Sequence, residues 1–223
     1  MFDEHYQGTF IDINSCKIGN INYIKSGTII YENCTLGDGV RIGHNVIIEE
    51  NCTIGNNTFI GHNCVLRPET KIDKNCIIGH NTVFEGKSII GEGTLIHAQC
   101  HITAGAEIGR YVFIAPMYLG ANDSKMVHLR RHRHPFIMNG PHIKDGARIA
   151  SGVLMNPGVT IGENAVVGTG SVVTRNIPDG SVAYGSPAKV KRMVDPGENI
   201  WFGEDGCVEF DDYGNLRLGK TYE

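Results

Sequence analysis

Two histidines flank an amide side chain just before the longest irregular stretch of the sequence. They lie in the octapeptide Ile-His-Ala-Gln-Cys-His-Ile-Thr, as His97 and His101 on either side of Gln99. A neutral imidazole accepts a proton near pH 7, so either histidine could act as a general base beside a bound substrate. The alternative is an inert surface role, which is the usual one for a single exposed histidine.

The irregular stretch, residues 120–141, concentrates positive charge in a chain whose formal net charge is −4. Its cations and imidazoles are Lys125, Arg130, Arg131, Arg133, His128, His132 and His134, and its one acidic residue is Asp123. Arginine binds phosphate through two parallel hydrogen bonds, so we favour an anion site over an idle solvated loop. Because the patch is short and the chain is acidic, a phosphorylated small molecule fits better than nucleic acid.

A six-residue period predicts the elements that must position these side chains. Every sixth residue from Ile18 to Ile114 is large and apolar, and a small or β-branched residue usually stands two positions before it. Glycine, asparagine or aspartate between them tolerates the left-handed backbone of a tight turn. This period fits neither a helix nor an alternating strand, but it fits short strands joined by regular turns in a solenoid.

The period breaks once and then resumes for six more hexads. From Ile114 to Ile143 there are 29 residues where one hexad would use six, which leaves about 23 extra residues in the excursion. Counting three hexads on from Ile102 reaches Gly120, where the hexads stop. His101 should therefore lie beneath the root of the excursion.

These repeats resemble the hexapeptide-repeat family, whose fold is a left-handed parallel β-helix with three hexads in each coil. We therefore expect an all-β chain built on that fold. The expected parts are a cap at residues 1–17, the β-helix at 18–192 with its loop at 120–141, and an extension at 193–223. We expect the extension to form a small hairpin on the last coil.

The last coils, from Ser151 to Arg192, resemble the end of a hexapeptide acyltransferase. In that family this region forms the CoA-binding part of a groove between neighbouring subunits, and the active protein is generally a homotrimer. The resemblance implies that Ser151 and Thr169 bracket the pantetheine arm of acetyl-CoA. The residues that it places near the nucleotide phosphates are Thr174, Arg175, Lys189 and Arg192.

Residues 112–123, VFIAPMYLGAND, resemble part of the nucleotide-diphospho-amino-sugar N-acetyltransferases. That resemblance implies acetyl transfer from acetyl-CoA to the amino group of a nucleotide-linked sugar, with O-acetyl transfer as an alternative. His97 or His101 would accept the amine proton, and His128 is a further candidate. Asn122 would orient the acceptor sugar. The other residues expected to contact the substrate are Gln99, Asp123, Arg130, Arg131, Arg133 and His134.

The tripeptide Gly-His-Asn recurs at residues 43–45, 61–63 and 79–81, which stacks His44, His62 and His80 in successive coils. Imidazoles are good zinc ligands, so a metal-dependent hydratase of the carbonic anhydrase kind is the rival function. Outward side chains stack in any regular solenoid, however, so we favour a structural ladder and expect no metal.

Composition sets the remaining expectations. Of the seven cysteines, six occupy the small inward position of a hexad, which suits free thiols in a reducing, cytoplasmic compartment. Cys207 alone remains in the C-terminal extension, too few for a zinc site there. No apolar run is long enough to span a bilayer, and the acidic start MFDEHYQG does not resemble a signal peptide.

Overall fold

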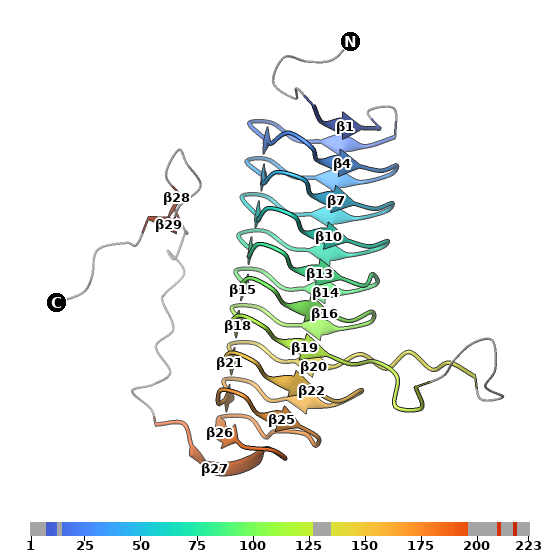
Figure 1. The fold of residues 1–223 in the computed structure, drawn as a ribbon. Helices are drawn as coiled ribbons and strands as arrows, with labels where there is room; N and C mark the ends of the chain where they lie inside the picture. Colours follow the sequence, from blue (N-terminus) through green and yellow to red (C-terminus); the bar gives the residue numbers. More distant parts are fainter. Residues whose placement is uncertain (1–7, 13–14, 127–134, 196–208, 211–215, 218–223) are drawn as a thin grey trace.

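The computed structural model describes residues 8–12, 15–126 and 135–195, together with the backbone of 209–210 and 216–217. Two-residue strands follow one another along a three-sided column of about nine turns (Figure 1). The column is the predicted left-handed parallel β-helix, and the predicted fold class is confirmed.

Each side of the column is one sheet, and each sheet takes every third strand in chain order. Sheet A contains β1 (Phe10–Ile11), β4 (Ile29–Ile30), β7 (Ile47–Ile48), β10 (Val65–Leu66), β13 (Val83–Phe84), β16 (His101–Ile102), β19 (Leu119–Gly120), β22 (Leu154–Met155) and β25 (Val172–Val173). Sheet B contains β2 (Lys17–Ile18), β5 (Thr35–Leu36), β8 (Thr53–Ile54), β11 (Lys71–Ile72), β14 (Ile89–Ile90), β17 (Glu107–Ile108), β20 (His142–Ile143) and β23 (Thr160–Ile161).

Sheet C closes the triangle and carries the last paired strands of the column. Its strands are β3 (Tyr23–Ile24), β6 (Arg41–Ile42), β9 (Phe59–Ile60), β12 (Ile77–Ile78), β15 (Leu95–Ile96), β18 (Phe113–Ile114), β21 (Arg148–Ile149), β24 (Val166–Val167), β26 (Ser181–Tyr184) and β27 (Lys189–Met193). All its pairs are parallel except β26 with β27, which run antiparallel. In the extension, β28 (Glu209–Phe210) and β29 (Leu216–Arg217) pair antiparallel, as the predicted hairpin requires. The predicted packing of this hairpin on the last coil stays a prediction.

The six-residue period builds the core because it puts one large residue from each strand inside the column. Ile30, Ile60 and Ile78 are completely buried, as are small partners such as Cys64 and Cys76. The turn residue just before the small partner often adopts positive φ, and at many of these turns it is asparagine, namely Asn33, Asn45, Asn51, Asn57, Asn63, Asn75, Asn81 and Asn164. Asparagine tolerates this conformation better than most residues, which explains why it recurs there.

The excursion leaves sheet A after β19 and rejoins the column at β20 of sheet B (Figure 1). Glu107 pairs with His142, which lies 35 residues later in the chain. Paired residues in a regular coil are separated by three hexads, so the excursion adds just under three further hexads of chain. The expectation of about 23 extra residues, nearly four hexads, is wrong, because β19 is a complete hexad that ends in glycine. The root of the excursion is closed by the Asn139 N–H, which donates to the Asn122 carbonyl at 2.9 Å.

Both ends of the column depart slightly from the expected boundaries. β1 pairs with β4 in sheet A, so the first coil begins inside the segment predicted as a cap. Residues 1–7 lie outside the described part of the chain. Over the described residues, no helix has the length and apolarity needed to cross a bilayer.

Candidate functional site

His101 lies on sheet A, one coil before the root of the excursion, as the hexad count predicted. Its Nε2 atom lies 3.2 Å from Oε1 of Glu85, and the hydroxyl of Thr103 donates to Oε2 of the same carboxylate at 3.0 Å. The His101 side chain is 38% exposed and the Glu85 side chain 35% exposed. A carboxylate beside one ring nitrogen fixes the tautomer and orients the ring, as general-base pairs require.

His97 and Gln99 lie in the turn that leads from sheet C to sheet A. The exposed His97 ring packs edge-to-face on Phe113, with 5.3 Å between ring centroids. Gln99 holds the positive-φ position of the turn, and its N–H donates to the carbonyl of His80 at 2.9 Å. The structure therefore gives His101 a carboxylate partner and gives His97 an aromatic one.

The described part of the excursion places two more predicted residues at its root. The Asn122 amide donates to the Ala104 carbonyl at 3.1 Å, which ties the start of the excursion to the preceding coil. Asp123 accepts the Lys125 N–H at 2.8 Å in a local turn. Several predicted residues lie outside the described part of the chain, namely His128, Arg130, Arg131, Arg133 and His134.

The residues predicted to hold CoA lie on the last coils but on different edges of the column. Ser151 and Thr169 stack in one turn between sheets C and A, where the Gly170 N–H donates to the Ser151 carbonyl at 2.9 Å. The exposed Thr174 and Arg175 follow β25, at the opposite edge of sheet A. Lys189 and Arg192 are exposed on β27, where Arg192 lies 3.5 Å from Asp195.

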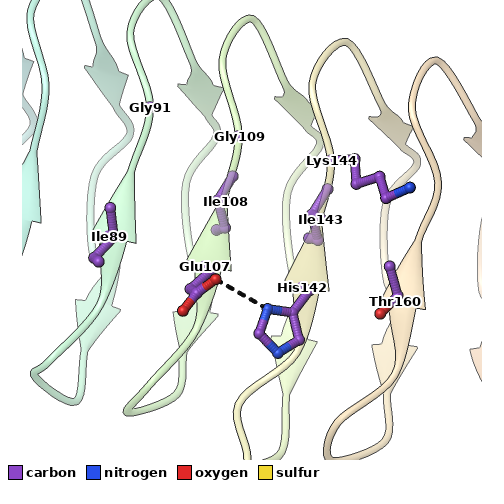
Figure 2. Close-up of a pocket in the computed structure, with 9 residues that line it drawn as sticks. All are labelled: Ile89, Gly91, Glu107, Ile108, Gly109, His142, Ile143, Lys144 and Thr160. Carbon is purple, nitrogen blue, oxygen red and sulfur yellow. Dashed lines mark hydrogen bonds and ion pairs between the residues drawn. The ribbon is translucent and has the colours of Figure 1, made fainter.

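A hollow of about 620 Å³ lies on sheet B, where the excursion returns to the column. Its lining residues are Ile89, Gly91, Glu107, Ile108, Gly109, His142, Ile143, Lys144 and Thr160. Figure 2 shows the His142 ring beside Glu107, and Nδ1 of His142 lies 3.2 Å from Oε2 of Glu107. The hollow therefore contains a second carboxylate–imidazole pair, on the other side of the excursion from His101.

One rim of the hollow is fixed by charged contacts. Lys144 donates to Asp179 across 3.1 Å, and the Glu163 N–H donates to the same carboxylate at 2.9 Å. The backbone hydrogen bond from Glu163, and then the ammonium of Lys144, lower the pKa of Asp179. Asp179 therefore stays ionised near neutral pH and holds Lys144 at the edge of the hollow.

The three stacked histidines form a ladder whose hydrogen bonds run to the backbone. Ring centroids are 5.2 Å apart between His44 and His62 and 4.8 Å apart between His62 and His80. Nδ1 of His62 accepts the N–H of His44 at 2.7 Å, and Nδ1 of His80 accepts the N–H of His62 at 2.8 Å. These contacts support the predicted structural role. The described residues include no group of three or more His, Cys, Asp or Glu side chains that could share one metal ion.

Sequence reasoning did not select Glu85, Thr103, Glu107 or His142. Glu85 and Thr103 are one coil apart in the sequence, so the coil period alone could have stacked them on each other, but not the diagonal contact from Glu85 to His101. His142 and Glu107 are 35 residues apart, and only the true length of the excursion brings them together.

The sequence pattern that defines the bacterial transferase hexapeptide family (six repeats) matches residues 15–50, 51–86, 87–117 and 140–175. These segments make up more than half of the chain. The chain belongs to this family. Membership confirms the predicted hexapeptide-repeat family and places the protein among transferases. Among curated proteins, no sequence matches the chain.

Two solved structures resemble this member of the bacterial transferase hexapeptide family. The UDP-N-acetylglucosamine acyltransferase LpxA of Bacteroides fragilis 9343 is 21% identical, with a TM-score of 0.71, and the match covers 86% of this chain and 74% of that one. The UDP-N-acetylglucosamine acyltransferase of Campylobacter jejuni is 15% identical, with a TM-score of 0.54, over 84% of this chain and 74% of that one. At these identities the similarity shows a shared β-helical fold.

Proposed function

We propose that the protein transfers an acyl group, most simply acetyl, from acyl-CoA to the amino group of a nucleotide-linked amino sugar. One observation carries the proposal: the root of the excursion is bracketed by two carboxylate–imidazole pairs, His101 with Glu85 and His142 with Glu107. An imidazole held by a carboxylate is the arrangement that a general base needs. Membership of a transferase family, and the named activity of the LpxA-like neighbours, support the reaction class.

The reaction requires little beyond alignment and one proton acceptor. The neutral amine attacks the thioester carbonyl, a C–N bond forms and the C–S bond breaks. The imidazole takes the proton that the amine loses and returns it to the departing thiolate of CoA. Holding the two substrates in line can lower the barrier by about 7–11 kcal/mol, and a general base adds about 10²–10⁴-fold.

The remaining substrate contacts are proposals that follow the sequence predictions. Arg130, Arg131 and Arg133 would bind the diphosphate of the acceptor, because paired N–H donors match phosphate oxygens. Ser151 and Thr169 would let the thin pantetheine arm lie along the turn. We further propose that the protein works as a homotrimer in the cytoplasm.

Release of the CoA thiol from acetyl-CoA tests the proposed function. The acceptors are UDP- and dTDP-linked amino sugars, and the matched controls are the same compounds already N-acetylated. We expect thiol release with at least one free amine, none with its N-acetylated control, and a product that gains one acetyl group. Equal release with and without a free amine would contradict transfer to nitrogen.

A further inference from the structure

The pair formed by His142 and Glu107 and the pair on sheet A leave different ring nitrogens available to accept a proton. Glu107 contacts Nδ1 of His142, so a ring that donates Nδ1–H carries its lone pair on Nε2. Glu85 contacts Nε2 of His101, which leaves the lone pair on Nδ1. Because Nε2 projects farther from the main chain than Nδ1, His142 can reach a bound substrate with less steric hindrance.

The surroundings of the two pairs also differ. His142 and Glu107 both line the hollow on sheet B, which offers space for an acceptor group beside the imidazole (Figure 2). Both oxygens of Glu85, by contrast, are already engaged, one by His101 and the other by Thr103. The pair on sheet A therefore forms a closed network, whereas the pair on sheet B faces an open space.

The hollow also adjoins two segments of the chain that the sequence predictions connect with the substrates. His142 directly follows Pro141, the last residue of the excursion whose cations would bind the acceptor. On the other side, the N–H of Thr160 donates to Oδ1 of Asn176 at 2.9 Å. Asn176 directly follows Arg175, which the family resemblance assigns to the phosphates of CoA.

We infer that His142 is the catalytic general base of the proposed transfer and that Glu107 is the residue that positions it. This inference rests on the proposed function and narrows it to one imidazole. Nε2 of His142 takes the amine proton as the C–N bond forms, and the imidazolium then protonates the sulfur as the C–S bond breaks. Glu107 stabilises the imidazolium between these steps and keeps its own charge.

Five variants of the full chain test the inference with acetyl-CoA and the accepted amino sugar. His142→Gln removes the base, and Lys71→Gln changes an exposed residue in the same outward column of sheet B, two coils before Glu107, as the matched control. We expect His142→Gln to lower kcat about 10²–10⁴-fold with little change in KM for acetyl-CoA, and Lys71→Gln to match the wild type. A His142→Gln protein that keeps more than about a tenth of kcat would overturn the inference.

Glu107→Gln and Glu107→Asp test positioning through the split between kcat and KM. Loss of the carboxylate should lower kcat with little change in KM, because the ring loses its orientation while both substrates still bind, and aspartate should restore part of kcat. A glutamate with a purely structural role would give no recovery of kcat with aspartate over glutamine. His101→Gln tests the competing hypothesis that His101 is the general base. A loss of kcat in His101→Gln, with none in His142→Gln, would assign the base to sheet A and overturn the inference. If the wild type releases no thiol with any amine, the proposed function itself fails. If the wild type is active and His142→Gln keeps its kcat, only the inference about His142 fails.

Discussion

In the coil that leads into the excursion, Tyr118 and Gly120 reverse the usual order of side-chain sizes. The large residue stands at the inward position that is normally small, and glycine stands at the one that is normally large. Tyr118 stands one coil after Cys100, in a column of small residues, whereas Gly120 pairs with Met155 in a column of large ones. The Tyr118 ring is buried, and its hydroxyl lies 3.5 Å from the Met155 sulfur. A Cβ on Gly120 would approach the Tyr118 hydroxyl oxygen to 3.0 Å, so the ring fills the space that the missing side chain leaves.

Restoring ordinary hexad residues at one of these positions alone should destabilise the protein. Gly120→Ile overpacks the coil at a cost of about 1–3 kcal/mol, and Tyr118→Ala opens a cavity at a cost of about 3–5 kcal/mol. The double variant should recover part of the loss, because the new isoleucine fills the cavity. Urea unfolding of the wild type and the three variants measures this coupling. Strictly additive losses would show that the two positions do not share one space.

The same reversal explains how far the sequence could predict the excursion. The hexads place every described inward residue up to Ile114 correctly, because the core accepts one large and one small residue from each hexad. The hexad that ends at Gly120 is complete but does not show in the sequence pattern, because Tyr118 supplies the large inward side chain in place of residue 120. The sequence count therefore missed one hexad and overestimated the number of extra residues in the excursion.

The pairs around the candidate site show a second limit of sequence reasoning. His101 could be placed beneath the excursion, because strands three hexads apart must be neighbours in this period. Glu85 approaches it diagonally across adjacent strands, and that contact depends on side-chain direction and not on register. To predict the contact between His142 and Glu107, the number of residues in the excursion had to be known. The reversed sizes of Tyr118 and Gly120 made that number appear too large.

The histidine ladder should make stability depend on pH. Burial, followed by the neighbouring charges of His80, His44 and Lys25, lowers the pKa of His62 below its ordinary value of 6.5. The folded state therefore favours the neutral ring, and this contribution is present above pH 6.5 and is lost as pH falls below it. Urea unfolding at about pH 7.5 and about pH 5.5 should show a smaller free energy of unfolding at the lower pH.

The variant His62→Gln isolates this contribution from the other titrations. Glutamine keeps a hydrogen-bond acceptor for the His44 N–H but does not titrate, at a cost of about 0.5–1.5 kcal/mol near neutral pH. The difference between the two pH values should shrink relative to the wild type. An unchanged difference would mean that His62 does not contribute to the pH dependence.

The buried cysteines should resist alkylation while the protein is folded. Burial raises the pKa of Cys64 to about 11 and that of Cys76 to about 12, so almost no thiolate is present near pH 8. A Cys207→Ser variant removes the cysteine outside the described residues. Iodoacetamide should then modify Cys16, which is partly exposed, before the five buried thiols, and peptide mass spectrometry measures the order. Rapid labelling of Cys64 or Cys76 in the folded protein would contradict the burial.

Substitution should destabilise the protein strongly at Gly61 and hardly at all at Gly170. A Cβ on Gly61 would lie 2.6 Å from the backbone nitrogen of His80 and 2.8 Å from its Nδ1, so Gly61→Ala forces two coils apart and disrupts the ladder. Gly170, at φ 65°, has no atom within 4 Å of the equivalent position. Gly170→Asn introduces the residue that holds this conformation elsewhere in the column, for example at Asn63 with φ 57°.

Thermal and urea unfolding of these two variants should separate crowding from backbone strain. We expect Gly61→Ala to cost about 3 kcal/mol, because the obstructing atoms include backbone that cannot move without shifting a coil. Gly170→Asn should stay within about 0.5 kcal/mol of the wild type, since asparagine tolerates positive φ and meets open space. If Gly61→Ala lost as little free energy of unfolding as Gly170→Asn, the spacing between coils would adapt to an added methyl group. In that case the close approach of imidazole to backbone would not depend on the glycine beneath it.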